Sequence, residues 1–145
     1  MILCDGDIKE EIERKRIVIE PFDEKSLTPN GYDLTIGDVR SLKNKVKAKE
    51  WFLISTKEYI ILPNDVCAQL WIRSSFARKG IFCSFGKVDA GFEGTLTIGC
   101  FNANNNEIEI KRGERFIQIV FERMSSGAEK AYSGKYKGQK GIKTE

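Results

Sequence analysis

The sequence predicts an all-β fold, a sandwich or a barrel, with one short helix near the N-terminus. Short runs of β-branched and aromatic residues follow one another from position 51 to position 121, separated by Gly, Pro, Asn and Asp. No helical pattern alternates with these runs, which disfavours an α/β fold. The 145 residues contain no domain linker or internal repeat, and the length suits a single domain with a sizeable core.

Local pattern predicts the individual elements in order. Residues 5–13 predict the helix, because an aspartate at position 5 or 7 can cap it and two isoleucines share one face. Residues 17–22 predict a strand that ends at its proline, and residues 28–37 predict a turn followed by a strand. Residues 74–79 predict one helical turn. The remaining predicted strands have the sequences WFLIS, EYIILP, VCAQLWIR, IFCSFG, TLTIGCFN, IEIKRG and FIQIVF.

Composition and charge exclude several classes of function. The formal net charge of +3, from 24 basic and 21 acidic side chains, is too small to predict a nucleic acid as partner. No apolar run is long enough to cross a membrane, and no signal-peptide pattern is present, so we expect a cytoplasmic protein. The absence of histidine removes Ser-His, Cys-His and His-metal mechanisms. The four cysteines lack a Cys-x-x-Cys pair, which disfavours a zinc site or a secreted disulfide scaffold.

Two short segments contain the main functional signal. Arg73, Ser74 and Ser75 place a guanidinium fork beside two hydroxyl groups and the amides of a predicted helix start, which are donors suited to phosphate. Taken alone, this motif is more often a solvated turn with an N-cap serine. Asp89 lies in a turn with Gly91 and precedes a predicted strand. It is either a turn aspartate that bonds to its own backbone or a general base that acts on water.

Two further segments allow a structural or a functional interpretation. Gln118, in the strand FIQIVF, is either a structural amide or a phosphate ligand. Residues 125–145 are rich in Gly, Lys and Ser, with Tyr132 and Tyr136 interleaved. Their composition favours a disordered basic terminus. The alternative is a phosphate-binding arm, in which glycines allow close backbone approach and lysines such as Lys135 supply charge.

The order of the motifs is more specific than any one of them. MILCDGDI, IVIEPF and TPNGYDLTIG are followed by RSSFARKG, VDAGFEGTLTI, GERFIQIVF and YSGKYKGQKG. In this order, and over nearly its whole length, the sequence resembles the dCTP deaminase/dUTPase family, with an opening like that of the deaminase branch. The resemblance implies a distorted β-barrel of jelly-roll type over residues 1–145. It also implies a homotrimer with active sites between subunits, and a C-terminal arm, about residues 125–145, that closes over the nucleotide.

The resemblance further implies roles for individual residues. Asp89 would orient or deprotonate the attacking water, and Asp33 would lie near the site, in catalysis or in structural support. Arg78 matches the arginine that partners a catalytic glutamate in the deaminase branch. Mg²⁺ would bind through phosphate oxygens and waters, with no direct protein ligand. The expected phosphate-binding residues are Arg73, Ser74, Ser75, Gln118 and Lys135, the expected nucleoside-binding residues are Phe85, Lys87, Phe92 and Tyr136, and Gln139 would belong to the closing arm.

Two departures from the family pattern bear on the reaction. Gly99 stands where the deaminase branch has a glutamate that shuttles protons during attack on cytosine, and glycine cannot transfer a proton. The hairpin that reads the pyrimidine edge, residues 81–87, is shorter than in the family. The sequence therefore predicts triphosphate binding more firmly than it predicts the choice of base.

These observations favour hydrolysis of dUTP to dUMP and pyrophosphate, a reaction of pyrimidine deoxynucleotide metabolism. That reaction needs the aspartate, the phosphate donors and magnesium, but not the missing glutamate. Two alternatives stay open. One is a dCTP deaminase that forms dUTP, or that continues to dUMP, with a base from elsewhere such as Glu93. The other is a trimer that binds deoxyuridine or deoxycytidine triphosphate without turnover. Neither a nucleic acid nor a membrane is expected as a partner.

Overall fold

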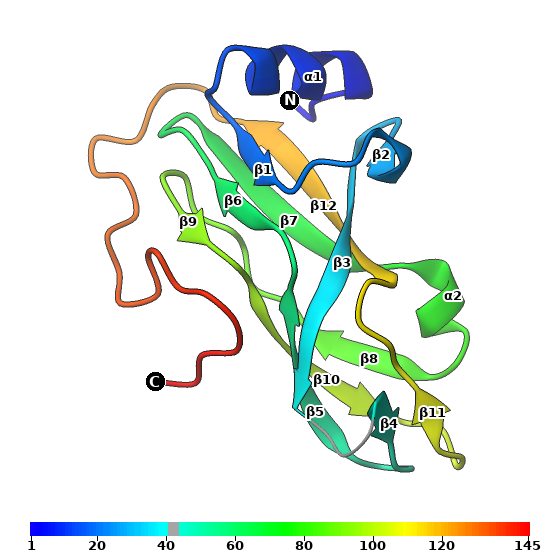
Figure 1. Ribbon diagram of the computed structural model, residues 1–145. Coiled ribbons are helices and arrows are strands. Elements are labelled where there is room, and N and C mark those ends of the chain that lie inside the picture. The colour runs from blue at the N-terminus through cyan, green and yellow to red at the C-terminus, as the bar shows by residue number, and fades with distance from the viewer. Residues whose placement is uncertain (41–43) are drawn as a thin grey trace.

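The computed structural model describes residues 1–40 and 44–145, which form mostly β-strands and a short N-terminal helix (Figure 1). The predicted helix and strands are confirmed, whereas the two-residue strands at positions 27, 45 and 93 were too short to predict. The elements are α1 (Asp5–Glu13), β1 (Val18–Glu20), η1 (Glu24–Ser26), β2 (Leu27–Thr28), β3 (Gly31–Arg40), β4 (Lys45–Val46), β5 (Trp51–Thr56), β6 (Tyr59–Ile61), β7 (Val66–Ile72), α2 (Ser74–Ala77), β8 (Ile81–Ser84), β9 (Glu93–Gly94), β10 (Thr97–Asn102), β11 (Ile108–Glu109) and β12 (Arg115–Arg123).

The strands form a near-closed antiparallel barrel, as the sequence predicts. The largest sheet has the order β7–β12–β3–β5–β10–β8, with β2 added beside β3. Val88, shortly after β8, pairs with Ala68 of β7 through two backbone hydrogen bonds of 2.9 Å, and this isolated bridge joins the two ends of the sheet. A smaller sheet, β1–β6–β9, and the pair β11–β4 complete the structure. No helix within the described residues has the length and apolar character needed to span a bilayer.

The core follows from the alternation of side chains along the paired strands. In β12, Ile117 and Ile119 are fully buried and lie opposite inward-facing residues of β3 and β7. Gln118, between them, is partly buried and points to the other face of the sheet, because successive side chains of a strand point to opposite faces. Burying each of these isoleucines contributes roughly 1.5–3 kcal/mol. At the start of β3, Gly31 is required by close approach, because a Cβ there would overlap the carbonyl oxygen of Ile119.

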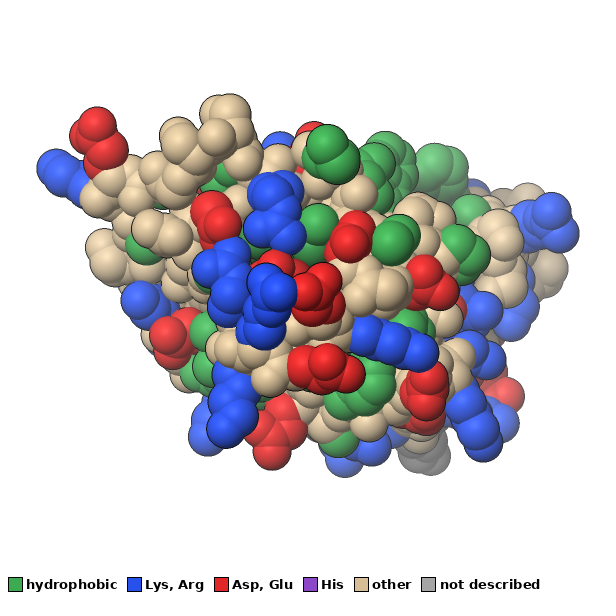
Figure 2. Space-filling model, turned by 90° about the horizontal axis from the view of Figure 1, so that it is seen from above, with side chains coloured by type: hydrophobic (Ala, Val, Ile, Leu, Met, Phe, Trp, Pro, Cys, Tyr) green, Lys and Arg blue, Asp and Glu red, His purple; other side chains and the backbone are tan. Residues whose placement is uncertain are grey.

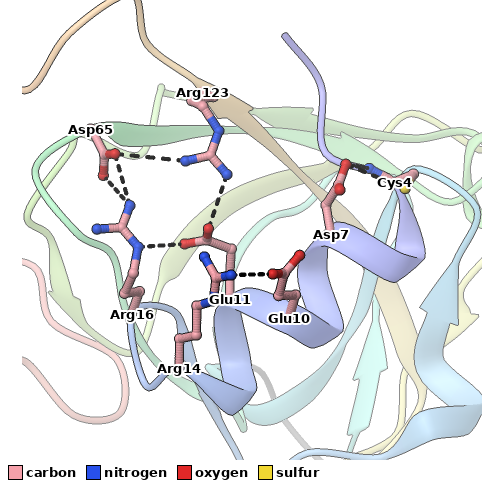
Figure 3. Close-up of polar contacts among 8 residues, drawn as sticks. All are labelled: Cys4, Asp7, Glu10, Glu11, Arg14, Arg16, Asp65 and Arg123. Atoms are coloured by element: carbon pink, nitrogen blue, oxygen red, sulfur yellow. Dashed lines mark hydrogen bonds and ion pairs between the residues drawn. The ribbon is translucent and has the colours of Figure 1, made fainter.

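Helix α1 is held against the end of β12 by backbone pairing and by packing. Ile8 is fully buried, and the amide of Leu3 donates to the carbonyl of Phe121 at 2.9 Å. The expectation that an aspartate caps the helix needs a correction. Cys4 is the N-cap residue, and the Asp7 carboxylate accepts hydrogen bonds from its backbone amide and its thiol, each at 3.3 Å (Figure 3).

A ring of four charged side chains joins α1 to two distant parts of the chain (Figure 3). Arg16 Nε contacts Glu11 at 2.8 Å, and Arg16 Nη2 donates to both carboxylate oxygens of Asp65 at 2.8 Å. Arg123 Nη2 contacts the other oxygen of Glu11 at 2.9 Å, and its Nη1 lies 3.7 Å from Asp65. Figure 2, which looks down on this end of the molecule, shows basic and acidic side chains interleaved over its surface.

Glu11 is the buried member of this ring, with only 5% of its side chain exposed. Burial works against its charged form, but hydrogen bonds from Arg123 and Arg16 outweigh that effect and lower the pKa of Glu11 below its usual value. A carboxyl whose pKa is lowered by folding stabilises the protein above its unfolded-state pKa of about 4.3. That stabilisation is lost as the pH falls through the lower folded-state pKa.

We expect Glu11→Gln to reduce the free energy of unfolding at neutral pH by about 2–3 kcal/mol, because the two arginines lose a shared, desolvated carboxylate. Urea unfolding monitored by tryptophan fluorescence measures this change. The matched control is Glu10→Gln, since Glu10 pairs with Arg14 on the exposed face of the same helix and such pairs contribute about 0.3–0.5 kcal/mol. Equal effects of the two substitutions, or an unchanged loss of stability below about pH 4.3 in Glu11→Gln, would contradict this assignment.

Candidate functional site

The first group of predicted site residues meets where β7 ends and α2 begins. The amide of Arg73 donates to the carbonyl of Phe116 at 3.0 Å, which fixes the backbone beside β12. The side chain of Arg73 then reaches across the sheet. Its Nε lies 3.1 Å from Asp33 Oδ2, and its Nη1 donates to the carbonyl of Arg115 at 3.2 Å. These contacts hold one edge of the guanidinium and leave its remaining N–H groups able to bind an anion.

Gln118 lies beside this arginine in the same layer of side chains. Trp71, Gln118 and Asp33 are directly opposite one another in the register of β7, β12 and β3. The Gln118 amide Nε2 donates to Thr28 Oγ1 at 2.9 Å, which fixes the orientation of the side chain. Gln118 is therefore at least a structural amide, and its position next to Arg73 also suits a phosphate ligand. Sequence reasoning assigned no role to Thr28, although it opens the motif TPNGYDLTIG, or to the exposed Trp71, which directly precedes the strand end at Ile72.

The electrostatics of this group favour an anion. Burial raises the pKa of Asp33, and the positive charges of Arg73 and Arg115 oppose that rise. The single carboxylate of Asp33 lies in the field of two positively charged arginines, so the group as a whole retains positive charge. Ser74 and Ser75 lie exposed at the start of α2. Arg78, the residue at which α2 ends, is also exposed. We give the name arginine group to six residues at this place, without Arg78: Asp33, Arg73, Ser74, Ser75, Arg115 and Gln118.

The second group surrounds Asp89, next to the bridge between Val88 and Ala68 that joins the ends of the large sheet. We call this bridge the seam of the barrel. Asp89 is exposed, and its carbonyl accepts a hydrogen bond from the amide of Phe92 at 3.1 Å, which closes the turn. Its carboxylate accepts no hydrogen bond from any residue that the structure describes, so the turn does not use it. A pocket of about 260 Å³ opens beside it. The lining residues are Lys87, Val88, Asp89, Phe92, Leu96, Thr97, Tyr132, Tyr136 and Gln139.

Asp89 also lines a second pocket. The second pocket, of about 420 Å³, is lined by Cys67, Lys87, Asp89, Ala90, Met124, Ala128, Lys130 and Tyr132. Lys87 and Tyr132 therefore line both pockets together with Asp89. An exposed carboxylate that lines two cavities is suited to contact a bound molecule and a water at the same time. We call the residues around the first pocket the Asp89 pocket.

The C-terminal segment lies against the Asp89 pocket. Although its composition favours disorder, the segment is fixed by specific hydrogen bonds. The amide of Gly138 donates to the carbonyl of Glu93 at 2.7 Å, and Gln139 Nε2 donates to the carbonyl of Thr95 at 2.7 Å. Gln139 is 9% exposed, and its Oε1 is buried without a hydrogen-bond partner among the described residues. An unpartnered buried acceptor costs about 1–3 kcal/mol, so this oxygen is a natural contact for a donor on a ligand.

Other predicted nucleoside and arm residues take mixed positions. Phe92 is buried, and its ring lies 5.6 Å from that of Tyr132. Phe85 is half-buried against the core and does not line either pocket around Asp89. The Lys135 ammonium lies 5.0 Å from the ring centre of its neighbour Tyr136, which lines the Asp89 pocket. The structure thus gathers Lys87, Phe92, Tyr136 and Gln139 around Asp89 and leaves Phe85 outside.

The arginine group and the Asp89 pocket lie far apart within one chain. Val88 pairs with Ala68 on one edge of β7. Arg73 comes five residues after Ala68, directly after the end of β7, which corresponds to about 16 Å along a strand. The Arg73 side chain also extends towards β3, two strands away from β7 and on the side opposite Val88. A single chain therefore does not bring Asp89 and Arg73 to the same phosphate.

Gly99 occupies a special position next to the Asp89 pocket. Thr97, which lines the pocket, and Gly99 are two residues apart on β10 and face the same side. The indole of Trp51 covers this position, since a Cβ on residue 99 would lie 3.4 Å from Trp51 Nε1 and 3.5 Å from Cζ2. Position 99, which the motif resemblance matches to the glutamate of the deaminase branch, thus holds no titratable group, and an aromatic ring lies over it.

Neither group is built to bind a metal ion directly. Within the described residues, no three His, Cys, Asp or Glu side chains converge to hold a metal. The donor set of arginines, serines and an amide suits phosphate instead. These residues fit Mg²⁺ that is carried on phosphate oxygens and waters, which is how this ion often binds in phosphoryl-transfer sites.

Solved structures with this fold include two nucleotide enzymes. A 2'-deoxycytidine 5'-triphosphate deaminase from Agrobacterium tumefaciens matches with a TM-score of 0.70 and 22% identity over 83% of this chain. The match spans 47% of that chain, so this chain covers about half of its length. The dUTPase of Staphylococcus bacteriophage 80alpha matches with a TM-score of 0.59 and 18% identity, over 81% of this chain and 96% of that one. At these identities the likeness shows the fold, a dUTPase-type barrel.

Sequence comparison shows the family. A family model described as dCTP deaminase-like matches residues 2–50 and 45–124, and this chain belongs to that family. A dCTP deaminase of Thermococcus kodakarensis is 44% identical over 138 residues, covering 88% of this chain and 89% of the relative. A probable deoxyuridine 5'-triphosphate nucleotidohydrolase of Sulfolobus islandicus rod-shaped virus 1 is 44% identical over 153 residues, covering 98% of this chain and 96% of the relative. The resemblance stated from the motifs is confirmed.

We expect Arg73→Lys to weaken the binding of inorganic tripolyphosphate at least about 10-fold, because lysine cannot contact Asp33 and present a planar fork at once. Titration calorimetry measures the change. Arg112→Lys is the control, since Arg112 is an exposed arginine paired with Asp38 outside the arginine group. Equal affinities of the Arg73→Lys and Arg112→Lys proteins would remove Arg73 from the anion site.

Proposed function

We propose that this protein hydrolyses dUTP to dUMP and pyrophosphate. The observation that supports the choice of reaction is Gly99. Deamination of cytosine needs a proton shuttle beside the ring, and position 99, next to the Asp89 pocket, has no side chain and lies under Trp51. Hydrolysis needs a carboxylate at the α-phosphate and donors for the triphosphate. Asp89 and the arginine group are suited to these two tasks.

In the proposed reaction, Asp89 takes a proton from a water whose oxygen attacks the α-phosphorus. The bond between the α-phosphorus and the bridging oxygen breaks on the opposite side, and pyrophosphate leaves. An exposed carboxylate with no internal hydrogen bond is free to orient this water. Phe92 and Tyr136 supply apolar surface for the nucleoside in the adjoining pocket, and the free Oε1 of Gln139 accepts a hydrogen bond from the ligand.

The phosphate donors come from a second copy of the chain. Since the arginine group lies about 16 Å along β7 from the seam, a neighbour must supply Arg73, Ser74, Ser75 and Gln118 to the triphosphate held at Asp89. A closed ring of three copies repeats this contact with one interface type. We therefore propose a homotrimer with three shared sites, in which the C-terminal segment with Lys135 covers the nucleotide.

Exposed aromatic side chains support contact between copies. Phe101 of β10 lies directly opposite Trp51 of β5 and Phe82 of β8, so the three residues form one row across three strands. Trp51 is 63% exposed, Phe82 67% and Phe101 38%. A contiguous row of exposed aromatic rings is typical of a protein interface rather than a solvated surface. The row lies on the same face of β10 as Gly99, which is adjacent to the Asp89 pocket.

Mg²⁺ is the expected cofactor of this reaction. When bound to the triphosphate, it neutralises part of the negative charge that builds up during phosphoryl transfer. Arg73, with Ser74, Ser75 and Gln118, binds the remaining phosphate oxygens. The chain itself needs no carboxylate cage for this arrangement, in agreement with the donor set described above.

Deamination of dCTP is the second candidate, and the names of the relatives favour it more strongly than dUTP hydrolysis. Proteins named dCTP deaminase from Thermococcus kodakarensis and Pyrococcus horikoshii are 44% and 45% identical to this chain. A relative from Aquifex aeolicus is named a dUMP-forming dCTP deaminase. In this chain the reaction would need another acid/base in place of residue 99, such as Glu93 near the same turn.

Incubation with dUTP or dCTP, each with and without Mg²⁺, distinguishes the candidates. We expect pyrophosphate and dUMP from dUTP with Mg²⁺, and no ammonia from dCTP. Asp89→Asn should lower the rate of dUTP hydrolysis by about 10²–10⁴-fold, because the amide cannot accept the proton from water. Chromatography of the nucleotides and a pyrophosphate assay measure both outcomes.

Glu93→Gln is the control, because Glu93 lies in the same turn region and has no role in the proposed hydrolysis. Ammonia release from dCTP that is lost in Glu93→Gln would establish the second candidate instead. Tight binding of dUTP without turnover would identify a non-catalytic binding protein. Full activity of Asp89→Asn would remove Asp89 from the reaction.

Mixing two inactive variants tests the shared site. Arg73→Ala removes a phosphate donor and Asp89→Asn removes the proposed base, so each protein alone should be inactive. If each site combines the two groups from different copies, refolding an equal mixture should restore about a quarter of the sites. Differently tagged chains, co-purified after mixing, show that mixed oligomers form. Mixed oligomers without regained activity would contradict the shared site.

A further inference from the structure

Cys83 and Cys100 face each other across two adjacent strands. They are directly opposite in the register of β8 and β10, and their sulfur atoms lie 3.4 Å apart. Opposite residues of an antiparallel pair have Cα atoms about 4.5–5.5 Å apart, which is within the range of about 4.4–6.8 Å found in disulfides. Both cysteines are free thiols in this structure. A small change in the two side chains would bring the sulfurs to bonding distance.

We propose that Cys83 and Cys100 form a reversible disulfide that closes the segment supplying Asp89 and most of the lining of the Asp89 pocket. The two cysteines are 17 positions apart, and the residues between them include Asp89, Phe92 and Thr97. Within the described residues, β8 pairs only with β10 and is the last strand in the order of the large sheet. The bond would therefore tie an edge strand covalently to its neighbour at the base of this segment.

The burial of the two thiols sets the order of the reaction. Cys83 is partly exposed, whereas Cys100 is 1% exposed, and contact with Cys83 together with burial raises the pKa of Cys100. An external disulfide such as oxidised glutathione therefore reacts first at Cys83. This step forms a mixed disulfide and releases one glutathione thiol.

Cys100 completes the bond from within the fold. Its sulfur attacks Cys83 Sγ in the mixed disulfide, loses its proton and releases the second glutathione thiol. Overall, two protein thiols give up two protons and two electrons, and one glutathione disulfide is reduced to two thiols. A reducing thiol reverses both steps. The other two cysteines lie elsewhere, with Cys4 at the start of α1 and Cys67 in β7.

The test treats the folded protein with oxidised glutathione, blocks the remaining thiols and maps the peptides by mass spectrometry. We expect a peptide pair linked through Cys83 and Cys100, a mass loss of two hydrogen atoms, and reversal by dithiothreitol. Cys83→Ser should abolish the link, and the control Cys67→Ser should retain it. The proposal is overturned if Cys83 and Cys100 both remain alkylatable while the exposed Cys4 has taken up glutathione.

A stability measurement tests the structural effect of the bond. Closing a loop of this length should lower the unfolding equilibrium constant about 100-fold in the oxidised protein. Urea unfolding of the oxidised and reduced forms measures this ratio, which should disappear in Cys83→Ser and persist in Cys67→Ser. An unchanged unfolding constant in protein with a mapped Cys83–Cys100 bond would contradict the proposed closure of the segment.

Discussion

The pairing of β12 with β3 on one edge and β7 on the other is the constraint on which the rest of the structure depends. At the start of β12, the carbonyls of Arg115 and Phe116 hold the side chain and the amide of Arg73. At its end, the strand pairs with the N-terminal residues, and Arg123 joins the charged ring of α1. One buried strand thus positions the arginine group and anchors the helix, and Gly31 permits the close contact of strands between them.

The sequence predicts most of this fold because the apolar alternation is strong and local. It predicts Arg73, Asp89 and Gln118 as a set because their motifs follow one another in a recognisable order. Contacts between distant residues escape such reasoning. Thr28, for example, orients Gln118 from 90 positions away, and nothing in the motif TPNGYDLTIG indicates that contact. The composition of the C-terminal segment favours disorder, and only the family resemblance indicates an arm at the site, because the segment is held by individual hydrogen bonds that composition does not encode.

A single position separates two chemistries in this site. The proposed donors for a triphosphate would serve both hydrolysis of dUTP and deamination of dCTP, and the family contains relatives named for each reaction, so the family relationship alone does not choose between them. Gly99 does bear on the choice, because a proton shuttle must have a titratable side chain. The indole of Trp51 fills the space instead, and Trp51 belongs to the aromatic row that supports contact between copies. The position that bears on the proposed reaction and the aromatic row that supports contact between copies thus lie on the same face of β10.

The seam between Val88 and Ala68 is the least extensive strand contact that closes the barrel. Every other neighbouring pair along the path β7–β12–β3–β5–β10–β8 shares at least three register positions, whereas the seam is one isolated bridge. Amide protons there are expected to exchange with solvent through local opening, well before the protein unfolds globally. Because Asp89 follows Val88 directly, the same fluctuation changes the width of both pockets around the carboxylate. We therefore expect local opening beside the proposed ligand pocket, and a bound ligand should slow hydrogen exchange there.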